Sequence, residues 1–219
     1  MDGEILRNLR KDFRVEFRSR FSLNISIAFA VIVTIAVSIT AGGVPFPAMV
    51  QSVLLWVVIF FSAMNGLSHI FVREEDQATA LFLRISVAAD SIFISKFIFN
   101  QIFMLIVLAV VTPLFLFFLQ VEVLHPAHFI LSVVAGGISI AAATTILAAM
   151  TAKAGGKGSL FTIISFPVLL PVLWISISST NGALTPVLPK TGSVLFLLAF
   201  SGFISVISFL LFRFVWIDE

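Results

Sequence analysis

Long stretches without any Asp, Glu, Lys or Arg constrain the fold of this chain more than any other feature. They cover residues 21–72, 97–121, 123–152, 158–189 and 191–212. A helix needs about 20 apolar residues to cross the roughly 30 Å hydrocarbon core of a bilayer. Each stretch is therefore long enough for one membrane crossing, and the first is long enough for two.

The composition supports a membrane protein and excludes several other classes. Of the 219 residues, 60% are hydrophobic and 11% are charged, and the mean hydropathy is +1.16. Soluble domains are roughly 45–50% apolar and about 25% charged. The chain also has no cysteine, so it has no disulfides and no thiolate metal ligands. A soluble enzyme, a disordered protein and a disulfide-stapled secreted domain are excluded.

Six transmembrane helices follow from the charge-free stretches. The segment Gly42-Gly43-Val44-Pro45-Phe46-Pro47 breaks the first stretch into two spans with a tight turn. Helices satisfy their own backbone hydrogen bonds, which lipid requires. The predicted spans are 22–41, 48–72, 97–120, 129–151, 159–178 and 193–216. We therefore expect an all-α polytopic membrane protein, with residues 1–219 forming a single transmembrane domain.

The basic residues predict the orientation of these spans. All but one of the 13 Lys and Arg residues fall on one side of the predicted topology, and only Lys190 falls on the other. The positive-inside rule then places both termini in the cytoplasm. The net charge of +2 is thus a topology signal and does not indicate nucleic-acid binding. The first span is long for a signal peptide and is expected to be an uncleaved signal anchor, in a bacterial inner membrane.

Residues 1–20 have the pattern of an amphipathic helix. An apolar residue recurs every three or four positions, at Leu6, Leu9, Phe13, Phe17 and Phe21, with arginines and a lysine between them. A basic helix with an apolar stripe lies in the membrane interface, with its cations toward anionic lipid headgroups. It is either a generic anchor or the elbow helix that leads into the first span of a transporter.

The segment between the second and third spans, residues 73–96, is the longest predicted cytoplasmic piece. It combines an acidic cluster with an apolar helix face, and acidic residues suit a helix N-terminus. The candidate residues for contact with a soluble partner ATPase are Arg73, Glu74, Glu75, Asp76, Leu81, Phe82 and Arg84. The alternative is a solvated loop with a charged start.

No motif in the chain indicates catalysis or a bound cofactor. The run Ala154-Gly155-Gly156-Lys157-Gly158-Ser159 lacks the glycine spacing of a phosphate loop. Without a catalytic constellation, we expect no enzymatic activity, no catalytic residue and no directly bound cofactor or metal. Outer residues His125 and His128 are possible metal or haem ligands, but neutral loop histidines are the preferred interpretation.

Polar and irregular residues within the spans are expected to be structural. Asn65, Ser68, His69, Asn100 and Gln101 are interpreted as contacts between helices. Asp90 is a possible partner of Lys96, and both are expected at the membrane boundary, where they need no function. Prolines at 113, 167 and 171 are expected to kink their helices, and the pair at 136–137, both glycine, allows close helix approach.

Taken together, a basic amphipathic leader, six spans, and a cytoplasmic helix between spans two and three resemble the membrane subunit of an ABC-2-type exporter. More narrowly, residues 11–18, 56–95 and 157–174 are similar to the CcmB family, haem exporter protein B of cytochrome c maturation. All three tryptophans fall within predicted spans, so no outer loop carries a tryptophan-rich haem motif.

The resemblance implies partners and a division of labour. It implies a CcmA-like ATPase that supplies ATP hydrolysis, CcmC-like and CcmD-like membrane subunits, and a CcmE-like haem chaperone. Haem would be handled by the complex, and two copies of this chain, or one copy with another six-span subunit, are expected. A permease for another substrate, such as a lipid or drug, and a membrane assembly protein without an ATPase are the alternatives.

Overall fold

The computed structural model describes residues 2–67, 87–153 and 158–217. These residues form seven α-helices and no strand. The helices are α1 (Asp2–Ser19), α2 (Phe21–Ala41), α3 (Ala48–Leu67), α6 (Ala89–Phe118), α7 (Pro126–Lys153), α8 (Gly158–Leu184) and α9 (Thr191–Ile217). All but α1 are long and apolar enough to cross a membrane. The predicted all-α architecture with six spans is confirmed.

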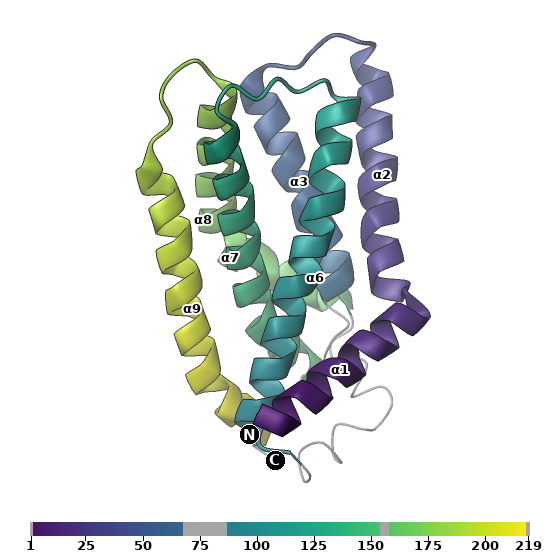
Figure 1. The fold of residues 1–219 in the computed structure, drawn as a ribbon, viewed down its shortest axis with the longest axis vertical. Helices are drawn as coiled ribbons and strands as arrows, with labels where there is room; N and C mark the ends of the chain where they lie inside the picture. Colours follow the sequence, from purple (N-terminus) through teal and green to yellow (C-terminus); the bar gives the residue numbers. More distant parts are fainter. Residues whose placement is uncertain (1, 68–86, 154–157, 218–219) are drawn as a thin grey trace.

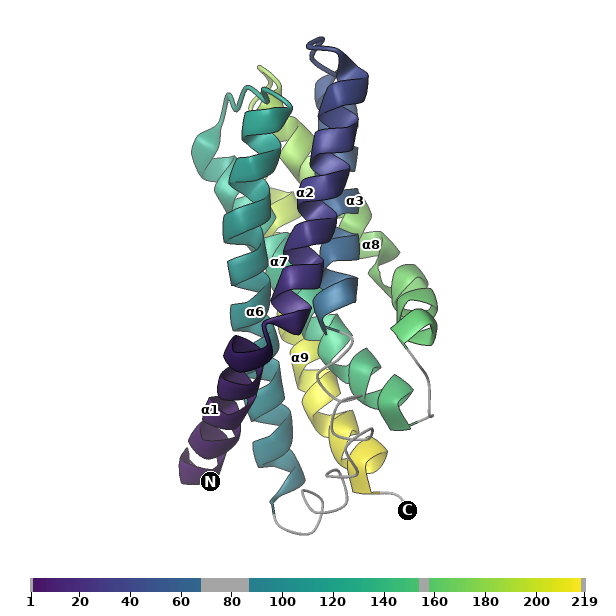
Figure 2. The ribbon, with the colours of Figure 1, turned by 90° about the vertical axis from the view of Figure 1, so that its right-hand side faces the viewer.

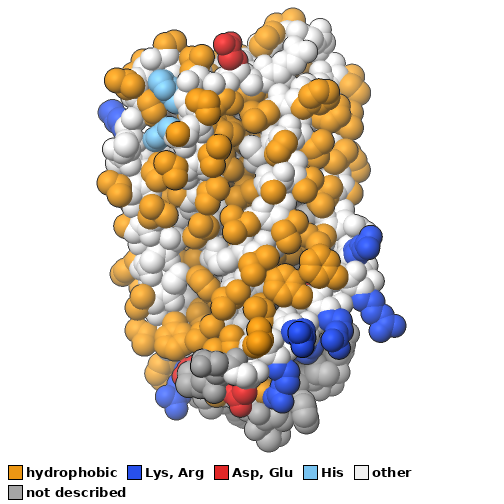
Figure 3. Space-filling model, in the orientation of Figure 1, with side chains coloured by type: hydrophobic (Ala, Val, Ile, Leu, Met, Phe, Trp, Pro, Cys, Tyr) orange, Lys and Arg blue, Asp and Glu red, His pale blue; other side chains and the backbone are white. Residues whose placement is uncertain are grey.

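The six spans run side by side as an antiparallel bundle, and α1 crosses one end of it obliquely (Figures 1 and 2). Both termini lie at the end that α1 crosses. Most of the described Lys and Arg residues also lie there (Figure 3), so we call it the basic end. The other end carries His125, in the connection between α6 and α7, and His128, in the first turn of α7, and we call it the histidine end.

Helix α7 occupies the centre of the bundle because its side chains are small. Within an apolar 18-residue stretch of each span, 78% of the residues of α7 are buried, compared with 17% of those of α2. The run from Gly136 to Thr145 consists of Gly, Ala, Ser, Thr and two isoleucines. Small residues allow helix backbones to approach closely in a bilayer, where packing replaces the hydrophobic effect as the driving force. The outer helices α2 and α9 instead expose large apolar side chains, as lipid-facing surfaces do.

Gly136 shows how tightly α7 packs on its neighbours. A Cβ atom at this position would collide with the indole of Trp56 on α3 and with the hydroxyl of Ser176 on α8. Trp56 is fully buried, and its indole Nε1 donates a hydrogen bond to Oγ1 of Thr180 on α8 at 2.9 Å. The close approach predicted for the glycine pair at 136–137 is confirmed.

Polar residues in the spans join helices, as predicted for two of them. The Asn100 amide on α6 donates to Oγ1 of Thr145 on α7 at 2.9 Å. The Gln101 amide donates to the carbonyl oxygen of Ile138, also on α7, at 3.3 Å. Ser68 and His69 lie outside the described residues.

Several helix boundaries differ from the sequence prediction. The third span was expected to begin at residue 97, but α6 begins at Ala89. The fourth was expected at 129, but α7 begins at Pro126, since proline is favoured in the first helical turn. His128 therefore lies in a helix, and its interpretation as a loop residue was wrong. Helix α8 continues to Leu184, and its first turns lean away from the bundle (Figure 2), as prolines within the helix predict.

Candidate coupling site at the basic end

The residues predicted to contact an ATPase belong to the segment that precedes α6. Arg73, Glu74, Glu75, Asp76, Leu81, Phe82 and Arg84 all lie outside the described residues. The structure does describe α6, which follows this segment in the chain and begins at Ala89, and helix α1, which packs against α6.

Helix α1 turns a polar face toward the bundle. Four polar residues, Glu4, Asn8, Asp12 and Glu16, follow one another at intervals of four, which places them on one side of the helix. Asn8, Asp12 and Glu16 are buried, with exposed fractions of 7%, 7% and 3%. Buried carboxylates need partners, and the neighbouring helices supply them.

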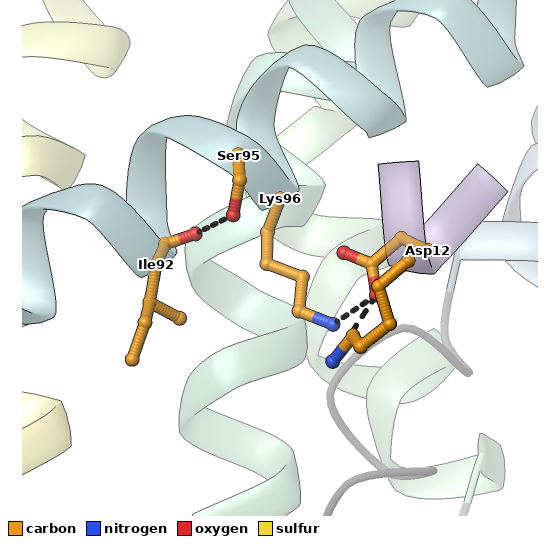
Figure 4. A network of polar contacts seen from close by, with 5 residues as sticks. Asp12, Ile92, Ser95 and Lys96 are labelled. Carbon is orange, nitrogen blue, oxygen red and sulfur yellow. Dashed lines mark hydrogen bonds and ion pairs between the residues drawn. The ribbon is translucent and has the colours of Figure 1, made fainter. Parts of the chain in front are cut away.

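A buried ion pair joins α1 to α6 on this face (Figure 4). Nζ of Lys96 lies 3.0 Å from Oδ1 of Asp12, and Lys96 is only 2% exposed. The Lys11 ammonium, which is partly exposed, lies 3.5 Å from the same oxygen. Asp90, the possible partner of Lys96 in the sequence-based interpretation, was the wrong one: among the described residues, Lys96 forms an ion pair with Asp12. Lys96 reaches it because α6 begins early enough to run alongside α1.

Glu16 fixes the turn between α1 and α2. Its Oε1 accepts a hydrogen bond from the backbone N–H of Leu23, and its Oε2 accepts one from Oγ of Ser22, both at 3.0 Å. Arg20 at the N-cap of α2 has a left-handed backbone (φ 52°) and makes no side-chain cap. Glu16 therefore satisfies an N–H group that the helix itself leaves free, and its charge suits the positive end of the helix.

Further contacts hold α1 along the base of α6. Oγ of Ser91 donates to Oε2 of Glu4 at 3.3 Å. The rings of Phe13 and Phe99 lie 5.0 Å apart, an aromatic contact that adds to the buried apolar area. On its other side, α6 contacts α9 through Phe93, whose ring lies 5.1 Å from that of Phe212. The start of α6 is thus connected to both α1 and α9.

The hydrogen bonding around the ion pair is incomplete. Oδ2 of Asp12 and Nδ2 of Asn8 have no hydrogen-bond partner in the part of the chain that the structure describes. Taking two charges out of water costs several kcal/mol for each ion, and well-packed apolar residues of similar volume are often equally stable. A partly satisfied network adds to this cost. Stability alone therefore does not explain why a carboxylate and an ammonium occupy this position.

The sequence pattern predicted α1 but not its polar face. It assigned the apolar stripe to the membrane boundary, whereas Leu9 and Phe13 pack against the core and Leu6 and Phe17 remain exposed. The polar residues recur every four positions, and this spacing could have predicted a polar face directed toward the bundle. The apolar residues have a similar spacing, so the pattern alone did not distinguish the two faces. Lys96 could not be identified as the partner of Asp12, because the two residues are 84 positions apart in the chain.

At the histidine end, the described polar contacts between α7 and α8 join one histidine to two serines and contain no carboxylate, lysine or arginine. Nε2 of His128 lies 3.0 Å from Oγ of Ser179, which lies 2.8 Å from Oγ of Ser132. Ser132 donates to the carbonyl oxygen of His128 at 2.7 Å. Since each hydroxyl has one proton, Ser179 then donates to Ser132, and Nε2–H of His128 donates to Ser179. His125 is tied by its backbone N–H to the carbonyl oxygen of Ala183, at 3.0 Å.

The family model described as CcmB protein matches residues 4–215, almost the whole chain. No curated protein matches it.

Proposed function

This chain belongs to the CcmB family, the haem exporter B family, and on that premise we propose that it couples ATP hydrolysis by a partner ATPase to haem delivery or to release of a haem-loaded chaperone. Membership makes it a multi-pass membrane subunit of a haem exporter for cytochrome c maturation. The family match carries this proposal. ATP hydrolysis belongs to a CcmA-like subunit, and this chain binds no cofactor itself. CcmC-like and CcmD-like subunits, a CcmE-like chaperone and a second copy of the chain complete the complex.

The coupling route begins at the segment before α6. In this proposal the ATPase binds the apolar face around Leu81 and Phe82. The conformational closure of the ATPase then displaces the start of α6. Burial of each of these side chains would contribute about 1.5–3 kcal/mol, whereas an exposed carboxylate at the rim contributes under about 1 kcal/mol. Because α6 packs on α1, α2, α3, α7 and α9, a shift of its first turns reaches most of the bundle.

The ion pair of Asp12 and Lys96 supports this route. A buried charge pair in one defined geometry specifies the register of two helices more strictly than an apolar contact, which tolerates sliding. We therefore assign it a positioning role: it makes α1 move with α6. Glu16 then transmits that motion to the start of α2 through its cap on Leu23.

Replacing both members of the ion pair by apolar residues tests this role. Asp12→Leu with Lys96→Met keeps similar volume and removes both charges, so the protein should fold and stay in the membrane. If the pair holds the register, ATPase stimulation by this subunit should fall while ATPase co-purification is retained. Lys96→Arg is the matched control, because it keeps the charge. Full stimulation in the double variant would contradict the positioning role.

A second experiment tests the docking of the ATPase itself. Leu81→Asp with Phe82→Asp should release the ATPase from purified membranes, because charges replace buried apolar contacts. Glu75→Gln is the matched control and should have a mild effect. Retention of the ATPase by the double aspartate variant, at equal expression, would place the docking site elsewhere.

The proposed orientation puts the basic end and both termini in the cytoplasm of a bacterium, with the chain in the inner membrane. Alkaline phosphatase is active only outside the cytoplasm. A fusion after Lys190 should therefore be active, and a fusion after Lys157 inactive. The reverse pattern would contradict the orientation.

A further inference from the structure

The structure separates the charges of α1 onto two faces of the helix. The carboxylates of Asp12 and Glu16 face the bundle, where Lys96, Ser22 and Leu23 engage them. Four arginines are exposed on the outside of the helix. They are Arg7, Arg10, Arg14 and Arg18, and we call them the cationic row.

The cationic row is therefore a stronger positive surface than the composition of α1 indicates. Acidic and basic residues alternate along the helix in sequence, but the two buried carboxylates are directed away from the row. Figure 3 shows basic side chains gathered over α1, below a broad apolar surface that covers the spans. Such a surface attracts anions, and the attraction depends on ionic strength.

An exposed apolar edge runs beside the cationic row. Leu6 and Phe17 on α1 are 65% and 54% exposed, and Phe21 at the start of α2 is 49% exposed. On a surface that combines cations with large exposed apolar side chains, the apolar side chains stay exposed to water even when a soluble polyanion binds the cations. Such a surface suits the boundary between headgroups and acyl chains, where both kinds of side chain are satisfied.

The position of α1 fixes which surface it meets. Only Arg20 separates α1 from α2, and α2 is a membrane span. A helix joined to a span by a one-residue turn, and packed across the end of the bundle, must lie at the membrane surface (Figure 2). The cationic row is then at the level of the lipid phosphates.

We propose that the cationic row is a binding surface for anionic phospholipid headgroups, with Leu6, Phe17 and Phe21 inserted at the acyl boundary. The guanidinium groups bind lipid phosphates through paired N–H donors, and the net negative charge of the lipid adds long-range attraction. This inference rests on α2 as a span and is independent of the proposed coupling to an ATPase.

The test measures which lipids surround α1 in the full-length protein. Because the chain has no cysteine, Phe17→Cys gives a unique labelling site for a fluorophore. The labelled protein is reconstituted in nanodiscs with equal amounts of phosphatidylglycerol and phosphatidylcholine, one of which is brominated to quench the fluorophore. Quenching by brominated phosphatidylglycerol should exceed quenching by brominated phosphatidylcholine, by about five-fold if one arginine contact dominates. The excess should fall at high salt.

Two variants and a second label make the result specific. Replacing all four arginines of the row by glutamine should abolish the preference, whereas replacing all four by lysine should retain most of it. A label at Phe203→Cys, which is 66% exposed on α9, is the control and should show no preference. Equal quenching by both lipids at position 17, or a preference that survives the glutamine variant, would overturn the proposal. Protection of the label only when a partner protein is added would also overturn it.

Discussion

The two ends of the bundle use opposite chemistry to join their helices. At the basic end, α1 is held by carboxylates: Asp12 pairs with Lys96, and Glu16 caps α2. At the histidine end, α7 and α8 are joined by a chain of neutral hydrogen bonds through His128, Ser179 and Ser132. Among the described residues, buried charged side chains join helices only at the basic end.

The difference between the two ends shows which contacts constrain the relative positions of the helices. A buried ion pair must remain closed, because separation leaves an uncompensated charge in the protein interior. A neutral hydrogen bond between spans is worth only about 0.6 kcal/mol on average, since alternative partners exist. Helices at the basic end are thus constrained to move together, which suits the end where ATP-driven motion would enter. The neutral hydrogen bonds at the histidine end impose no comparable constraint.

The largest expected effect comes from breaking the ion pair on one side only. Lys96→Met leaves the Asp12 carboxylate buried beside Asn8 without its main partner. We expect a loss of about 3–5 kcal/mol in stability, the usual cost of an isolated buried charge. The measurement is the melting temperature of the detergent-purified protein by fluorescence-detected size exclusion.

The double variant with Asp12→Leu is the control for Lys96→Met. It should recover most of the lost stability, because no unpaired charge remains. If the single variant is as stable as the wild type, water reaches the pair, and the contrast between the two ends disappears.

Glu16→Ala has the next largest expected effect at the basic end. It removes the acceptor for the Leu23 N–H, and loss of an N-cap costs about 0.5–2 kcal/mol. Glu16→Gln keeps an acceptor oxygen and should cost less. Hydrogen exchange at the start of α2 is the specific measurement, since the Leu23 amide should lose protection in the alanine variant. Unchanged protection there would show that the turn at Arg20 is held by other contacts.

Much of this fold was predictable from the sequence, because the bilayer imposes simple rules. Charge-free runs gave six spans, and the break at residues 42–47 gave the first turn. The glycine pair at 136–137 gave the close approach on α7. The predicted helix boundaries were wrong where a helix continues through polar residues. In α6, Ser95 donates a hydrogen bond to the carbonyl oxygen of Ile92, so the helix accommodates polar positions that a limit set by hydropathy excludes.

The polar contacts of the candidate site were less predictable. Asp12 and Lys96 form a pair that depends on the angle at which α1 crosses α6, which no local pattern encodes. The cap by Glu16 was easier to predict, because Glu16 lies only seven residues from Leu23 in the chain. Local contacts follow from spacing along a helix, whereas contacts between distant helices require the packed bundle.

The smallest expected effect is at the histidine end, and it tests the contrast from the other side. His125→Ala with His128→Ala removes the hydrogen bond to Ser179 but creates no buried charge. We expect a loss of about 0.6 kcal/mol for that contact, at most about 1.7, and cytochrome c maturation largely intact. Ser179→Ala, which removes the same hydrogen bond without touching a histidine, is the matched control. Loss of holocytochrome in the histidine variant at normal membrane abundance, with Ser179→Ala unaffected, would mean that the imidazoles act on haem and that this end is more than a neutral contact between helices.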